Sequence, residues 1–318
     1  MTRDPRFEKA RVVVVGSSAM DVTARVERFP ELGESVRGTS VSASPGGKGA
    51  NAASMAARLG AGVELVSAVG DDLYGEELLR TLQTLGVGTD SVLRLAGQTG
   101  MGHIQVAADG NNKIISCAGV NADVGQEVVE AARAKIEQAD VVVGQLVLNQ
   151  EATLHAFTLA KAAGATTILN PSPMVPVLEG LQELVDVLIV NETEATFLSG
   201  CGVDDLPSAM TVAKSLVGGW GDVVIVTCGD KGVVAATAGD GIAIGAHEVE
   251  MVEASGAGDA FSGGLAAALG AGFDLAEALE VGSACGALTA TRAGSGAAQP
   301  SLDEVCSLLD GDEGLRVG

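Results

Sequence analysis

Short β-branched runs and longer helical runs alternate through the middle of the chain, and this alternation limits the possible folds more than any other feature. Strands are predicted at residues 141–143, 166–169, 187–190 and 223–227, and helices at 125–138, 151–163, 192–199 and 207–217. Strands that alternate with helices in this way run parallel in one sheet, with helices on both faces. Their connections are right-handed. The sequence therefore predicts an α/β fold on a mostly parallel, twisted sheet.

Segments on either side extend this core. The run Arg11-Val12-Val13-Val14-Val15 predicts a strand buried on both faces. Further strands are predicted at residues 64–69, 233–236 and 242–246, and further helices at 73–85, 275–290 and after Asp259. The last two strands have the spacing of an antiparallel hairpin. No low-complexity linker interrupts the pattern, so we expect one α/β domain over residues 1–318.

Two other segments alternate like strands but contain no helical run between their strands. The segment 21–45 alternates on either side of Phe29-Pro30, and the segment 97–121 contains a hairpin pattern around the turn sequence Asp109-Gly110-Asn111-Asn112. We assign these two segments, with approximate bounds, to a small β-sheet outside the main core. The sheet would be inserted in the α/β domain.

The net charge of −22 comes from 41 acidic and 19 basic residues and argues against nucleic acid or an anionic membrane surface as a partner. An anionic ligand such as ATP must then be held by helix ends, backbone N–H groups, Mg²⁺ and a few Lys or Arg. The five cysteines have no paired spacing, and residues 1–11 are too polar for a signal peptide. With no apolar run of membrane-spanning length, we expect a soluble, cytoplasmic protein with reduced thiols.

The stretch Gly256-Ala257-Gly258-Asp259 leads into an alanine-rich run that predicts a helix. Glycines let the backbone approach a ligand closely. The first N–H groups of a helix have no partner inside it and can bind a phosphate. A carboxylate beside them can take a proton from a hydroxyl while the N–H groups stabilise the transferring phosphoryl group. The alternative is a turn with a helix cap, a position where Asp is common.

Two further stretches suit a polar acceptor. Gly46-Gly47-Lys48-Gly49 allows close approach of the backbone, and Lys48 and Asn51 offer side-chain donors, although the spacing is not that of the Gly-x4-Gly-Lys-Ser/Thr phosphate loop. Asp21 comes soon after the first strand, at the carboxyl end where α/β sheets place ligands. The alternative for the glycine-rich stretch is a tight turn before a helix, and the alternative for Asp21 is an ordinary turn residue.

Two of the predicted strands are followed by polar residues that suit a nucleotide. Asn191 and Glu194 have the spacing of a capping box, or Glu194 orients Mg²⁺ through water, since Mg²⁺ keeps several of its waters. Thr227, Gly229 and Gly232 belong to a glycine turn. That turn either holds phosphates through N–H groups or is simply a loop.

Together, these motifs resemble the ribokinase-like (PfkB-type) carbohydrate kinase family, and within it the ribokinases, over residues 11–306. Five motifs in order carry the resemblance: Pro45-Gly46-Gly47-Lys48-Gly49-Ala50-Asn51, Asn170-Pro171-Ser172-Pro173, Asn191-Glu192-Thr193-Glu194, Gly256-Ala257-Gly258-Asp259 with Phe261 and Gly264, and Thr291-Arg292-x-Gly294. Each motif is weak alone, but five in the expected order are specific.

The resemblance implies transfer of the γ-phosphoryl group of ATP to a primary hydroxyl of a ribose-like sugar, mainly by positioning and charge stabilisation. Asp259 would be the base, and the N–H groups of Gly256, Ala257 and Gly258 would form the anion hole. The sugar site would contain Asp21, Gly46, Gly47, Lys48, Asn51 and Asp259. The nucleotide site would contain Asn191, Glu194, Thr227, Gly229, Gly232 and Gly258, with Glu194 holding Mg²⁺ through water.

The resemblance also implies a monovalent cation, usually K⁺, behind the anion-hole loop near Glu253, Ser255 and Gly294. The small β-sheet, formed by about residues 21–45 and 97–121, would act as a lid and form a homodimer contact. The partners would be ATP and a small-molecule sugar, with neither nucleic acid nor membrane.

The chain departs from the family at three points. Ribokinases have Asn and Glu where this chain has Ala19 and Val147, and Glu253-Ala254 replaces their Asp-Thr. Unpaired hydroxyls would lose roughly 1–3 kcal/mol each, so a nucleoside, a deoxy-sugar or a larger sugar is an alternative acceptor. A non-catalytic sugar or nucleotide sensor is another alternative. A dehydrogenase is argued against, because no Gly-x-Gly-x-x-Gly follows the first strand.

Overall fold

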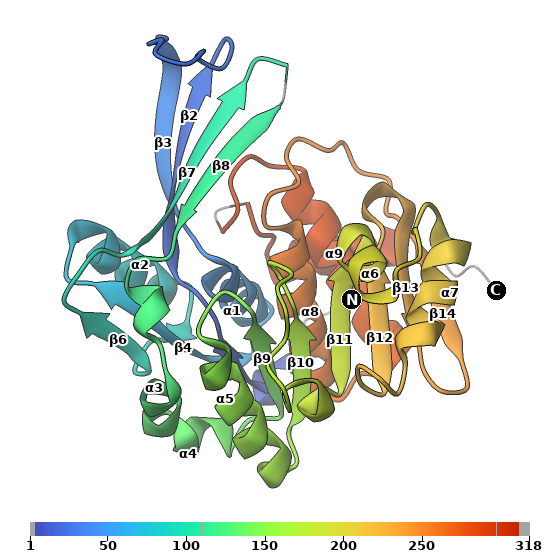
Figure 1. The fold of residues 1–318 in the computed structure, drawn as a ribbon. Helices are drawn as coiled ribbons and strands as arrows, with labels where there is room; N and C mark the ends of the chain where they lie inside the picture. Colours follow the sequence, from blue (N-terminus) through green and yellow to red (C-terminus); the bar gives the residue numbers. More distant parts are fainter. Residues whose placement is uncertain (1–3, 110, 297, 312–318) are drawn as a thin grey trace.

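The computed structural model describes residues 4–109, 111–296 and 298–311, and the predicted α/β fold is confirmed (Figure 1). The main sheet of the described residues has ten strands in the order β14-β13-β12-β11-β10-β9-β1-β4-β5, with β6 also paired to β4. They are β1 (Arg11–Val15), β4 (Gly62–Gly70), β5 (Val87–Gly88), β6 (Val92–Leu95), β9 (Val141–Gln145), β10 (Thr166–Asn170), β11 (Val187–Asn191), β12 (Val223–Thr227), β13 (Gly232–Ala236) and β14 (Gly241–Gly245). The β12-β13-β14 meander is antiparallel, and the other pairs are parallel.

Helices cover both faces of this sheet. Val12 and Val14 of β1 belong to one buried core and Val13 and Val15 to the other, because successive strand side chains point to opposite faces. The first core is covered by α1 (Lys48–Arg58), α2 (Leu73–Thr84), α8 (Ala257–Gly270), α9 (Leu275–Ala290) and α10 (Leu302–Gly311). The second is covered by α3 (Gln126–Ala131), α4 (Arg133–Ile136), α5 (Gln150–Ala163), α6 (Glu192–Ser199) and α7 (Leu206–Leu216). Burial on both faces explains the unbroken valine runs of the strands.

A small separate sheet projects from the edge of this body (Figure 1). Its strands are β2 (Ala19–Val26), β3 (Gly38–Gly46), β7 (Gly100–Ala107) and β8 (Asn112–Cys117), in the order β3-β2-β7-β8. In the register, Asp21 of β2 lies beside Ser44 of β3 and Gly102 of β7, and Gly102 lies beside Ser116 of β8. Since directly paired residues share a face, these four positions lie on one side of the sheet.

The prediction of one helix over residues 125–138 is wrong, because the helix is interrupted at Ala132. This residue has φ −91° and ψ 2°, and its N–H donates to the carbonyl of Val129, three residues back, at 3.0 Å. The apolar spacing survives the interruption, since Val128, Ala132 and Ile136 are all buried in the same core. A helical period in the sequence therefore does not reveal the break.

Two helices begin where they bear directly on the site. α1 starts at Lys48, with Gly47 at φ +92° as its N-cap. α8 starts at Ala257, so Asp259 lies inside its first turn. The short strands β5 and β6 and the last helix, α10, were not predicted. Among the described helices, none has the length and apolar character needed to cross a membrane.

Candidate active site

A cleft lies where the small sheet meets the carboxyl ends of the main strands, and it gathers residues that are far apart in the sequence. Its volume is about 410 Å³, and its lining includes Asp21 from β2, Lys48 and Asn51 from α1, and Asp259 from α8. Gly47, Gly256 and Ser295 also line it. The predicted acceptor and phosphate-binding segments therefore meet in one cleft.

The first turn of α8 has the geometry that suits an anion. Gly256 has φ +80°, a conformation that favours glycine, and places the helix start at Ala257. The N–H of Ala257 donates to the carbonyl of Ala254 at 3.2 Å, which closes the turn into the helix. Between described residues, no backbone hydrogen bond uses the N–H of Gly256 or Gly258. These two groups, more than that of Ala257, are available to an anion.

Asp259 is buried where the first turn of α8 contacts α1. Its side chain is 6% exposed, and Asn51 Nδ2 donates to its Oδ2 at 2.8 Å. Burial raises the pKa of Asp259, while the charge of Lys48 and the Asn51 hydrogen bond oppose the rise. A carboxylate with a raised pKa is a better proton acceptor, and Asn51 fixes its orientation.

Asp21 is held between glycines of two neighbouring strands. Ser295 Oγ donates to its Oδ2 at 2.9 Å. A Cβ atom on Gly46 would lie 2.1 Å from Oδ2, and one on Gly102 would lie 2.5 Å from Oδ1. Burial raises the pKa of Asp21 despite the Ser295 hydrogen bond, and the nearby charges of Asp259 and Glu253 add to the rise. The missing side chains of these glycines thus make room for a carboxylate in the cleft.

A second cavity of about 220 Å³ adjoins the first and shares Lys48, Gly256 and Asp259 with it. Its other lining residues include Asn170, Asn191, Glu194, Thr227 and Gly258. Two of these, Asn191 of β11 and Thr227 of β12, come together because they are neighbours in the parallel register. The first turn of α8 is therefore accessible from two sides, as a transfer between two ligands requires.

The capping-box interpretation of Asn191 and Glu194 is confirmed. Glu194 N–H donates to Asn191 Oδ1 at 2.8 Å, and Asn191 N–H donates to Glu194 Oε2 at 3.0 Å. The same carboxylate lines the second cavity. Gly229 and Gly232 are not among the residues that line this cavity. A Cβ on Gly232 would lie 2.1 Å from the carbonyl oxygen of Ile244, so the β13–β14 hairpin requires that glycine.

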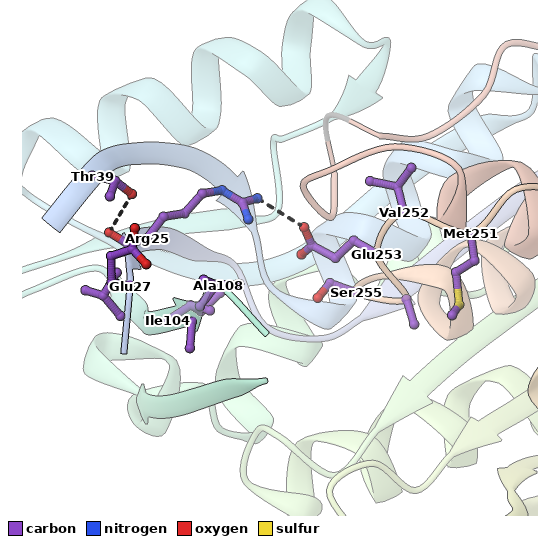
Figure 2. Close-up of a pocket in the computed structure, with 13 residues that line it drawn as sticks. Arg25, Glu27, Thr39, Ile104, Ala108, Met251, Val252, Glu253 and Ser255 are labelled. Carbon is purple, nitrogen blue, oxygen red and sulfur yellow. Dashed lines mark hydrogen bonds and ion pairs between the residues drawn. The ribbon is translucent and has the colours of Figure 1, made fainter. Parts of the chain in front are cut away.

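The residues expected around a monovalent cation lie together. The N–H of Gly294 donates to Glu253 Oε2 at 3.4 Å, and Ser255 follows two residues later. No sequence pattern pointed to Arg25, whose guanidinium lies 3.8 Å from the same Oε2 (Figure 2). Ser295 was also missed as a partner of Asp21, although it follows directly after the Thr291-Arg292-x-Gly294 motif.

Comparison with known proteins decides the family. A model described as "pfkB family carbohydrate kinase" matches residues 9–302. The chain belongs to the PfkB family of carbohydrate kinases.

This PfkB kinase has relatives that match it over nearly its whole length. It is 33% identical over 300 residues to a ribokinase of Haemophilus influenzae, covering 94% of this chain and 98% of the relative. It is 30% identical over 304 residues to a deoxyribokinase of Salmonella typhi, covering 95% and 99%. The structure of Arabidopsis thaliana ribokinase complexed with ribose and ATP matches with a TM-score of 0.88 at 27% identity, covering 94% of this chain and 98% of that one. The predicted family is confirmed, and the chain is a kinase that transfers phosphate to a sugar.

Proposed function

We propose that this kinase transfers the γ-phosphoryl group of ATP to a primary hydroxyl of a ribose-like sugar, with Asp259 as the base. One observation carries the proposal: Asp259, oriented by Asn51, lies where two cavities meet at the first turn of α8. The sugar would occupy the larger cavity beside Asp21, and the nucleotide the smaller one beside Asn191 and Thr227. The names of the relatives support ribose and ATP as ligands.

In the proposed reaction the acceptor hydroxyl gives its proton to Asp259 as its oxygen bonds to the γ-phosphorus. The bond from that phosphorus to the β,γ-bridging oxygen breaks, and ADP leaves with the electron pair. The N–H groups of Gly256 and Gly258 and the charge of Lys48 would stabilise the transferring group. Asp21, held by Ser295, would accept a hydrogen bond from another sugar hydroxyl and fix the orientation of the sugar.

Mg²⁺ fits the donor set of the second cavity. Glu194 is 7% exposed and lines this cavity together with Asn170 and Asn191, whose side chains carry amide oxygens. Mg²⁺ prefers such hard oxygen donors and retains several waters, so Glu194 would hold it through water. When bound, the ion neutralises phosphate charge.

A monovalent cation does not fit the residues found at Glu253. Its Oε2 receives the N–H of Gly294 and faces the guanidinium of Arg25. Both neighbours are hydrogen-bond donors that carry positive or partial positive charge, whereas a K⁺ ion needs oxygen ligands. We therefore route no part of the proposed reaction through K⁺.

A nucleoside or deoxy-sugar is the second candidate acceptor. Ala19, Val147 and Ile114 line the sugar cavity and make one side of it apolar. Ile104 and Ser255 line both this cavity and an outer one of about 770 Å³ under the small sheet. A pentose would leave this outer space unfilled, whereas a base attached to the sugar would extend towards it.

The deciding experiment is a screen of ribose, deoxyribose, fructose and nucleosides for acceptor-dependent ADP release. We expect turnover with a pentose or a nucleoside. Asp259→Asn should retain ATP binding and lose roughly 10²–10⁴-fold in turnover. The control Asp274→Asn exchanges one N-cap residue for another at the remote start of α9 and should be neutral. Substantial turnover by Asp259→Asn would reject this base. Ligand-induced thermal stabilisation without ADP release from any acceptor would favour a sensor instead.

For assembly and location, we propose a homodimer formed through the lid in a reducing cytoplasm. The face of the small sheet that points away from the sugar cavity carries Val41 and Ile115, which are 73% and 64% exposed. Exposed apolar residues on a sheet face are suited to pairing with a second copy. The five cysteines are free thiols, two of them exposed, as a reducing compartment maintains them.

A further inference from the structure

An ion pair joins the small sheet to the loop that precedes the anion hole. Arg25 is on β2, and its guanidinium lies 3.8 Å from Glu253 Oε2 across the outer cavity (Figure 2). Glu253 is three residues before Gly256, where the turn into α8 begins. The pair therefore links the small sheet to the loop that leads into α8.

Glu253 is itself fixed to the far end of α9. Its N–H donates to the carbonyl of Ala290 at 3.0 Å, and its Oε2 accepts from the N–H of Gly294 at 3.4 Å. The carboxylate thus joins three segments: the anion-hole loop, the turn after α9 and, through Arg25, the small sheet. A change at this carboxylate would be transmitted directly to the turn at Gly256.

The same face of β2 makes a second contact with this region. Asp21 and Arg25 are four residues apart on one strand, so their side chains point to the same face. Asp21 accepts a hydrogen bond from Ser295, one residue after the Gly294 that contacts Glu253. Two side chains of one strand thus hold the sheet against this region, Asp21 at Ser295 and Arg25 at Glu253.

Charge gives the Arg25 contact a further role. Asp21 is close enough to Asp259 and Glu253 that the charges of these two carboxylates help to raise its pKa. ATP would bring more negative charge to this part of an already acidic protein. The Arg25 guanidinium beside Glu253 offsets the charge of that carboxylate.

We propose that Arg25 is a positioning residue whose guanidinium takes the place of a monovalent cation at Glu253 and couples the position of the lid to the shape of the anion hole. This inference rests on the proposed function. It makes the kinase independent of K⁺, because the charge opposite Glu253 is built into the lid.

The test compares Arg25→Met and Arg25→Lys with wild type. Arg28→Met is the matched control, since Arg28 also lies near the end of β2 and pairs with Glu34, away from the anion-hole loop. Acceptor-dependent ADP release is measured in potassium buffer and in tetramethylammonium buffer of equal ionic strength. Thermal unfolding is measured in the same two buffers.

We expect wild type and Arg28→Met to respond equally in both buffers. Arg25→Met should lose about fivefold in kcat, the upper end for a partly exposed ion pair, with a smaller change in the acceptor KM. Potassium should restore part of this loss and raise the unfolding temperature of Arg25→Met alone, and Arg25→Lys should retain most of the activity.

Severalfold stimulation of wild type by potassium would overturn the proposal, as would a loss in Arg28→Met equal to that in Arg25→Met. If no acceptor supports turnover, the proposed function fails. The unfolding measurement still decides the role of Arg25, because a potassium effect confined to Arg25→Met supports it and equal effects in all proteins reject it.

Discussion

Replacing Gly46 by Ala tests the acceptor site most directly, because the structure predicts which atom the new methyl group would displace. The added Cβ would lie 2.1 Å from Asp21 Oδ2 and 2.7 Å from its Cγ, far inside ordinary contact distance. The carboxylate cannot remain there, and Oδ2 is the oxygen that accepts the hydrogen bond from Ser295. Gly46→Ala should therefore displace Asp21 and break this bond.

The size of the effect follows from the lost hydrogen bond. Hydrogen bonds to charged groups contribute about 2 kcal/mol, which corresponds to roughly a 30-fold change in kcat/KM. If Asp21 orients the acceptor, the loss should appear mainly as a higher KM for the acceptor, with the KM for ATP little changed. Initial rates of ADP release measured against each substrate in turn would separate the two constants.

Gly38→Ala is the matched control, because Gly38 lies on the same strand and its added Cβ would come no closer than 3.4 Å, to the carbonyl of Arg25. Alanine in a strand is slightly favoured over glycine, so this variant should be as active and as stable as wild type. An acceptor KM in Gly46→Ala within about twofold of that in Gly38→Ala would refute Asp21 as the acceptor anchor. Equal increases in the KM values for ATP and acceptor would also refute it.

Three further predictions concern other parts of the molecule. Burial raises the pKa of Asp259, so its ionised form costs stability as pH rises through that pKa. Asp259→Asn should therefore unfold at a higher temperature than wild type at neutral pH. The difference should shrink at acid pH, where Asp259 is protonated. Glu194→Ala and Glu277→Ala each remove half of a capping box, and each should lower the free energy of unfolding by about 1 kcal/mol in chemical denaturation. Only Glu194→Ala should raise the KM for Mg-ATP. Equal KM values in the two variants would contradict the proposed Mg²⁺ role. Val41→Lys on the outer face of the lid should convert a dimer to a monomer in light scattering, whereas Leu32→Lys in the β2–β3 turn should not; dimers in both variants would contradict the lid contact.

Short-range patterns predicted the fold well. The valines of β1 predicted a strand covered on both faces, because only a doubly buried strand has apolar residues at every position. The capping box at Asn191 was predictable because both partners lie within one helical turn. Helix breaks were less predictable, since Ala132 changes the hydrogen-bond pattern and leaves the apolar spacing intact.

The motifs of the candidate site were also visible in the sequence, but their geometry was not. The sequence determined that the chain contains the Gly256-Ala257-Gly258-Asp259 turn and a glycine-rich segment around Lys48, and it predicted phosphate and acceptor binding for them. Only the tertiary structure decided that Asn51 donates to Asp259, 208 residues away, and that Ser295 donates to Asp21, 274 residues away. These contacts depend on the order of strands in the two sheets and on the placement of α1 beside α8. No pattern of neighbouring residues encodes that order, because it is set by burial of the whole core.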